Sequence, residues 1–172
     1  MKHALFLLLA GCAPLAAVID PPLAQLARWQ AAPSLAGEQP VIQPCPEGHR
    51  ACPQLQARRA EACMARAMAA RAPAAACPGS AALGDLECAV VAYAAARRVD
   101  ASPALAAGQA QALICAGHLS ANRDHGRRAL EAAAAAPPDR APLLQARAQA
   151  VIDLPTAQGA LTSRNRNEGA RP

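Results

Sequence analysis

Histidine, cysteine and carboxylate side chains are the groups of this 172-residue chain with the best capacity for chemistry, and they are scattered. The chain contains no Gly-x-Ser-x-Gly segment, no His-Glu-x-x-His segment and no glycine-rich phosphate loop. His118 and His125 flank a predicted turn between helices, where exposed or capping histidines outnumber metal ligands. Asp85 and Glu87 lie at a predicted helix start, where negative charge suits the helix dipole. We therefore expect no enzyme activity, no catalytic residue and no cofactor.

The seven cysteines carry a stronger signal. Cys45, His49 and Cys52 are spaced like part of a zinc site, but a fourth ligand at suitable spacing is missing. No Cys-x-x-Cys pair occurs, so neither thioredoxin-like chemistry nor covalent haem attachment is supported. We expect disulfides rather than a metal site.

Composition excludes several classes of protein. Hydrophobic residues make up 53% of the chain but aromatic residues only 2%, which argues against a β-sandwich. No apolar run approaches the ~20 residues that a membrane-spanning helix needs. The net charge is +5, but the arginines are dispersed and lack interleaved aromatic residues, so nucleic-acid binding is not expected.

The N-terminus indicates export. Met1-Lys2-His3 is a short basic start, residues 4–10 (ALFLLLA) are apolar, and Leu9-Ala10-Gly11-Cys12 ends the segment. This segment resembles the lipobox signal of bacterial lipoproteins, in which small residues precede the cysteine that is lipidated. The alternative is an ordinary secretory signal that is cleaved after a later small residue.

The lipobox resemblance implies removal of residues 1–11 and a lipid anchor on Cys12. Several acyl chains, at ~0.8 kcal/mol per buried CH₂ group, amount to permanent anchoring. In enterobacterial-type lipoproteins an aspartate after the cysteine favours the inner membrane. Ala13 stands at that position, so the resemblance implies the periplasmic face of the bacterial outer membrane.

The rest of the chain divides into a tether, a helical domain and a tail. Residues 12–44 are rich in proline and alanine, which predicts a tether with one short helix over residues 23–32. Residues 45–154 are predicted to form the domain, with helices over 54–71, 83–100, 103–119, 123–136 and 142–154. The polar residues 155–172 are expected to be disordered.

The segment 83–100 resembles the second half of a tetratricopeptide repeat. Gly84, Ala89, Tyr93 and Ala96 occupy the positions where that family has a turn glycine, a small contact residue, an aromatic residue and an alanine. The resemblance implies an all-α fold of antiparallel helical hairpins, with these four as repeat-packing residues. It weakens elsewhere, since the first helix of such a repeat is displaced to residues 54–71. A generic helical bundle is the alternative.

Six cysteines remain once Cys12 is set aside, and three disulfides among them have fifteen possible arrangements. If the helices over 86–100 and 103–119 are antiparallel neighbours with a turn centred near position 101.5, Cys88 and Cys115 lie at one level. This geometry predicts a Cys88–Cys115 disulfide. Proximity along the chain then predicts Cys45–Cys52 and Cys63–Cys77, although Cys77 lies in a loop that can reach elsewhere.

These observations predict a lipid-anchored, disulfide-stapled helical module at the outer membrane. Its expected work is protein–protein interaction, as a piloting or scaffold module for another envelope protein or peptide. The alternative is a structural or stress-related envelope lipoprotein without a dedicated ligand.

Overall fold

The computed structural model describes residues 20–42, 44–46 and 48–155, and these residues form helices and loops without a strand. The all-α prediction is confirmed. The elements in chain order are α3 (Pro21–Ala31), α4 (Cys52–Ala69), the short 3₁₀ helix η1 (Ser80–Ala82), α5 (Leu83–Arg97), α6 (Pro103–Ser120), α7 (Arg123–Ala134) and α8 (Ala141–Ile152).

Side-chain caps and prolines fix where several helices begin. The Asp20 carboxylate accepts a hydrogen bond from the backbone N–H of Leu23 at the start of α3. The Ser102 hydroxyl does the same for Leu105 at the start of α6. Both helices have proline in the first turn, where the missing N–H leaves no internal hydrogen bond unmade.

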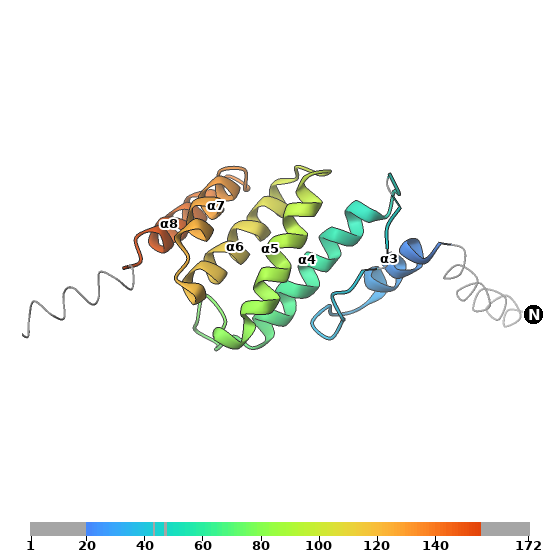
Figure 1. Ribbon diagram of the computed structural model, residues 1–172, viewed down its shortest axis with the longest axis horizontal. Coiled ribbons are helices and arrows are strands. Elements are labelled where there is room, and N and C mark those ends of the chain that lie inside the picture. The colour runs from blue at the N-terminus through green and yellow to red at the C-terminus, as the bar shows by residue number, and fades with distance from the viewer. Residues whose placement is uncertain (1–19, 43, 47, 156–172) are drawn as a thin grey trace, which may run out of the picture.

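Consecutive helices pack against one another in a row, with α3 at one end of the molecule and α8 at the other (Figure 1). Helix α6 also contacts α4 and α8 directly, so it lies at the centre of the arrangement. None of the helices described here has the length and apolar character required to cross a membrane.

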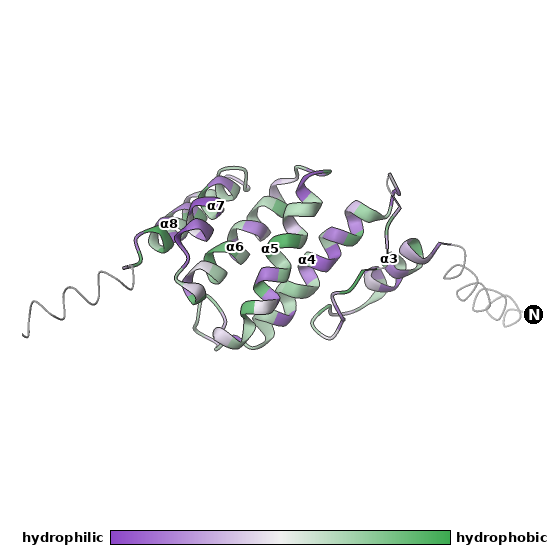
Figure 2. Ribbon diagram, viewed as in Figure 1, coloured by the Kyte–Doolittle hydropathy of each residue, from purple (hydrophilic) through white to green (hydrophobic). Residues whose placement is uncertain are grey.

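The main core lies where α4, α5, α6, α7 and α8 meet, and α6 contributes most to it. Apolar residues are concentrated on α5 and α6, whereas α4 and α7 carry more hydrophilic ones (Figure 2). From Ala112 to Gly117 every residue of α6 is buried. Many of these core residues are alanines, so the helices approach closely and each side chain buries little apolar area.

The segment from residue 20 to 42, predicted as part of a tether, instead packs on the domain. Leu26 and Trp29 of α3 form a separate small core with Ala51 and Leu55. Pro21 and Pro22 do not prevent this helix, because both occupy its first turn. The ordered part of the protein therefore includes α3, and the boundary predicted at residue 45 does not separate it from the helical domain.

Candidate functional site

The most distinctive polar site lies where α3, the loop before α4 and the first turn of α4 meet. Cys45 and Cys52 form a disulfide there, with Cα atoms 5.9 Å apart, and close a loop of sequence separation seven. Within the loop His49 donates its backbone N–H to the Pro46 carbonyl at 3.1 Å, and Gly48 has a φ of +74°. The glycine allows the tight turn that presents the His49 side chain to α3.

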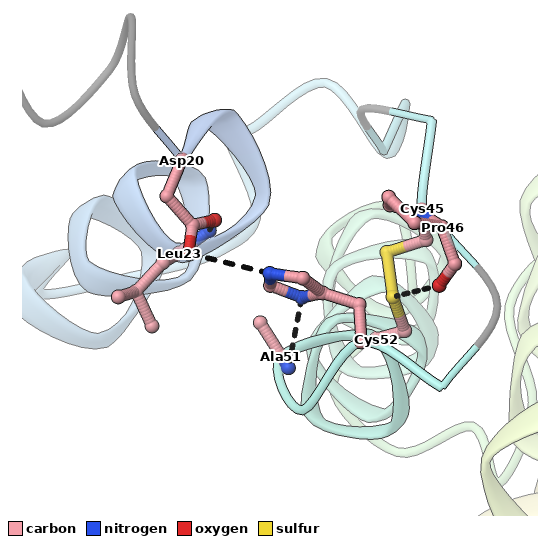
Figure 3. Close-up of polar contacts among 7 residues, drawn as sticks. Asp20, Leu23, Cys45, Pro46, Ala51 and Cys52 are labelled. Carbon is pink, nitrogen blue, oxygen red and sulfur yellow. Dashed lines mark hydrogen bonds and ion pairs between the residues drawn. A yellow bond between two sulfur atoms is a disulfide. The ribbon is translucent and has the colours of Figure 1, made fainter.

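The imidazole of His49 bridges α3 and α4 (Figure 3). Its Nδ1 accepts the backbone N–H of Ala51 at 3.2 Å, and its Nε2 lies 3.3 Å from Oδ2 of Asp20. A nitrogen that accepts a hydrogen bond carries no proton, so in the neutral ring the proton is on Nε2 and points to the carboxylate. Both ring nitrogens are therefore engaged, and His49 acts as a fixed link between the two helices.

Asp20 serves two neighbours at once. The backbone N–H of Leu23 is the main cause that holds the pKa of Asp20 below its usual value, and the positive potential of His49 and Arg50 adds to it. Burial acts in the opposite direction. An ionised Asp20 thus both caps α3 and holds the imidazole.

Trp29 anchors α3 beside this loop. Its side chain is 1% exposed, and its Nε1 donates to Oε2 of Glu38 at 3.1 Å. The same carboxylate lies 3.6 Å from the Arg28 guanidinium. The Gln25 side-chain amide donates to the carbonyl of Val41 at 2.7 Å. These contacts hold residues 34–42 against α3, where Leu35 and Ile42 pack against the small core of Leu26, Trp29, Ala51 and Leu55.

The zinc alternative for this loop does not fit the described geometry. Both sulfur atoms are used in the disulfide, and both nitrogens of His49 are hydrogen-bonded. Within the described ranges no group of three or more histidine, cysteine or acidic side chains is arranged to hold a metal ion.

The other two disulfides correct the predicted pairing. The structure joins Cys63 of α4 to Cys88 of α5 and joins Cys77 of the α4–α5 loop to Cys115 of α6. The predicted Cys88–Cys115 and Cys63–Cys77 pairs are therefore wrong, whereas Cys45–Cys52 is the pair that was predicted. Cys88 is joined to Cys63 of α4, so it cannot pair with Cys115.

The predicted repeat-packing residues divide into two groups. Ala89, Tyr93 and Ala96 are buried in the interior, as expected of packing residues. Gly84 is exposed near the start of α5, and a Cβ atom built there would touch nothing within 4 Å. Gly84 is therefore not one of the residues that let the helices approach.

Close approach occurs instead at a glycine that the sequence analysis did not single out. A Cβ at Gly108 of α6 would lie 2.5–2.7 Å from the ring and hydroxyl of Tyr93, so the ring covers this glycine. Burial is the main cause that raises the pKa of Tyr93 to about 12, and the negative charge of Glu61 adds to it while Arg140 opposes it. The small residues of α6 were the available signal for close approach at Gly108. Alanine is so common in this chain that this pattern does not distinguish α6 from the other helices.

A second polar cluster joins α5, α6 and α7. His125 is buried, with its Nε2 3.4 Å from Oε1 of Glu87 and its Nδ1 3.5 Å from Oγ of Ser120. The serine hydroxyl donates to the carbonyl of Ala116 at 2.7 Å, so its hydrogen is engaged within α6. This arrangement ties helices together, and the serine is not prepared as a nucleophile.

The remaining predicted residues have plainer surroundings. Asp85 lies in the first turn of α5, as predicted, and forms an ion pair with Arg66 of α4 at 3.3 Å. His118 is exposed in the last turn of α6. Cys12 lies outside the described residues.

No family model, curated protein or solved structure matches this chain.

Proposed function

We propose that the protein is a lipoprotein of the bacterial outer membrane, anchored through Cys12, whose helical domain binds another envelope protein or peptide. One observation carries the anchoring and the compartment. All six cysteines from Cys45 to Cys115 are joined in disulfides. The seventh, Cys12, stands in the lipobox-like motif. Disulfides of this number are typical of an oxidising compartment, so the pairing and the motif support the same location.

The arrangement of the helices supports the binding part of the proposal. Helix α6 packs on its neighbours α5 and α7 and also contacts α4 and α8, so alternate helices meet along one side of the row. These contacts support a stack of tetratricopeptide-like hairpins, whose alternate helices would line a surface for extended peptides or single helices. With few hairpins, the surface suits one short peptide or one partner helix.

The position of α3 limits how far the helical domain can lie from the lipid anchor. Asp20, the cap of α3, follows Cys12 by eight residues. Eight residues span at most about 28 Å even when fully extended. A lipid on Cys12 would therefore hold α3 close to the membrane surface, and the partner is expected to be membrane-proximal as well.

The anchor is tested by metabolic labelling with palmitate. The full-length protein should incorporate the label and partition into outer-membrane fractions, and the Cys12→Ala variant should do neither. The Ala13→Asp variant keeps the cysteine and is the matched control for labelling. Undiminished palmitate incorporation by Cys12→Ala would contradict the proposed anchor.

Binding is tested separately, by affinity capture of the lipidated protein from gently solubilised envelopes after mild cross-linking. We expect a defined envelope protein or peptide to be enriched relative to an untagged strain. The Gly126→Ala variant retains the anchor and disturbs the packing of α7 on α8, so it should recover less partner. If neither the native protein nor Gly126→Ala enriches any protein or peptide over the untagged strain, a structural lipoprotein without a dedicated ligand is favoured.

A further inference from the structure

The three disulfides differ in how much of each is within reach of solvent. Cys63 and Cys115 are both 0% exposed, so the Cys63–Cys88 and Cys77–Cys115 disulfides each have one fully enclosed cysteine and one that is partly exposed. Cys45 and Cys52 are both partly exposed. An external thiolate must approach a sulfur atom directly, so only the Cys45–Cys52 disulfide presents both of its cysteines to a reagent.

The two sulfur atoms of this disulfide have different surroundings. Cys52 is the first residue of the 18-residue helix α4, where backbone N–H groups and the helix dipole favour a negative charge. Cys45 belongs to the preceding loop and packs beside Leu26, Trp29 and Leu55. The start of α4 therefore favours Cys52 as the leaving thiolate and Cys45 as the sulfur that an attacking thiolate meets. The Pro46 carbonyl oxygen, 3.8 Å from Sγ of Cys52, acts against a thiolate there.

Opening this disulfide has a structural consequence because of what the loop carries. The loop presents His49, whose ring holds Asp20 at the start of α3 (Figure 3). Cys45 itself packs against the small core of Trp29. Helix α3 makes far less contact with α4 than the central helices make with one another, so the contacts through the loop add to those of the small core in holding α3.

From these observations we infer that Cys45–Cys52 is a thiol–disulfide exchange site for an external thiol, and that its opening loosens α3 from α4. In the first step an external thiolate forms a bond to Sγ of Cys45. The Sγ–Sγ bond breaks, and its electron pair remains on Sγ of Cys52. A second external thiolate then attacks the external sulfur of the mixed disulfide and releases Cys45. Two external thiols are oxidised to one disulfide, and their protons pass to Cys45 and Cys52.

The exchange is tested on the oxidised full-length protein with graded concentrations of reduced glutathione, followed by alkylation and peptide mass spectrometry. Cys45 and Cys52 should become labelled at no more than a tenth of the concentration that labels the other four cysteines. The other two disulfides are controls within the same molecule. Opening of Cys45–Cys52 together with them, or after them, would overturn the inference.

The direction of attack is tested by two measurements. At limiting glutathione the trapped adduct should be on Cys45, and an adduct chiefly on Cys52 would contradict the assignment. In the Cys45→Ser variant, the free Cys52 should react with iodoacetamide at pH 6 at least fivefold faster than the free Cys45 does in Cys52→Ser. Equal rates would remove the role assigned to the start of α4.

The effect on α3 is read from Trp29, which is the only tryptophan of the chain. Opening should shift its emission to the red, and the Cys45→Ala/Cys52→Ala protein should show the same shift without reductant. The matched control is Cys77→Ala/Cys115→Ala, because that disulfide lies in a different apolar cluster. Unchanged emission in the Cys45→Ala/Cys52→Ala protein, or an equal shift in the control, would show that the loop does not hold α3.

Discussion

Tyr93 on α5 is 7% exposed, and its ring lies over Gly108 of α6. The phenolate would be poorly solvated there, so the neutral form is favoured in the folded protein. The carboxylate of Glu61 strengthens this preference. The chain has a single tyrosine, so its ionisation can be followed without interference from another residue.

We expect absorbance near 295 nm to report a Tyr93 pKa of about 12 in the folded protein, against 10.0 as the ordinary value. Between these values the phenol ionises in the unfolded chain and stays neutral in the folded one. The free energy of unfolding should therefore be unaffected below pH 10 and fall as the pH rises from 10 to 12, by about 2–3 kcal/mol in all.

The matched variant is Tyr93→Phe, which retains the ring and removes the ionisable hydroxyl. When both proteins are unfolded with urea across the same pH series, the free energy of unfolding of Tyr93→Phe should lack the fall between pH 10 and 12 that is due to the tyrosine. A tyrosine that titrates near 10 in the folded state would show that the ring is accessible to water.

At the scale of elements, the packing of α7 on α8 depends on Gly126. A Cβ at this position would lie 2.8 Å from Cγ1 and 3.0 Å from the backbone nitrogen of Ile152, and 3.1 Å from the carbonyl oxygen of Ala148. Two of these three atoms belong to the α8 backbone, which cannot move aside as a side chain can. The two helices would have to separate to admit even a methyl group.

Gly126→Ala should therefore lower the free energy of unfolding by about 1–3 kcal/mol, even though alanine is the better helix former. Gly84→Ala is the control, because it makes the same chemical change in a helix at a position where nothing lies within 4 Å. That variant should be neutral or more stable by up to about 1 kcal/mol. Urea midpoints that move in the same direction for both variants would contradict the packing argument.

Helix positions could be predicted from the sequence because prolines, caps and loop residues mark them locally. The predicted helix over 103–119 is observed as Pro103–Ser120, and that over 54–71 as Cys52–Ala69. The docking of α3 could not be predicted in this way. It depends on Trp29 meeting Leu55, a contact between distant residues that no local pattern contains.

The disulfide error has a definite geometric cause. Tyr93 meets Gly108 across the turn between α5 and α6, so these two helices are neighbours as the prediction assumed. Cys88, however, precedes Tyr93 by five residues, which at about 100° per residue places it roughly 140° around α5. This rotation around the axis of α5 directs Cys88 toward α4 and its partner Cys63. The five-residue spacing between Cys88 and Tyr93 excludes the Cys88–Cys115 pair once Tyr93 is known to face α6.

At the scale of the whole molecule, the disulfides compensate for a core built largely of alanine. Cys63–Cys88 joins α4 to α5, and Cys77–Cys115 joins the loop between them to α6. Cys45–Cys52 closes the loop beside α3. The cross-links thus secure the row of helices from its α3 end to α6, and the last cysteine of the chain is Cys115. Helices α7 and α8 rely on close backbone approach instead.

The three disulfides should contribute unequally to stability. Their sequence separations are 7, 25 and 38, and the entropy of the unfolded chain is restricted more by the closure of a longer loop. On this basis they contribute roughly 2.5, 3.5 and 4 kcal/mol respectively. Removal of Cys77–Cys115 should cost the most, because it also releases the loop that packs beside Leu86 and Ala116.

The ranking is measured by urea unfolding of three double alanine variants, one for each disulfide, in which the other two disulfides remain oxidised. The Cys77→Ala/Cys115→Ala protein should have the lowest midpoint and the Cys45→Ala/Cys52→Ala protein the highest. Because the latter disulfide closes only a short loop at one end, its loss should leave α4 to α8 folded, with helical circular dichroism nearly unchanged. If that variant lost the most stability, the ranking by loop length would be wrong and the α3 end would be an essential part of the core.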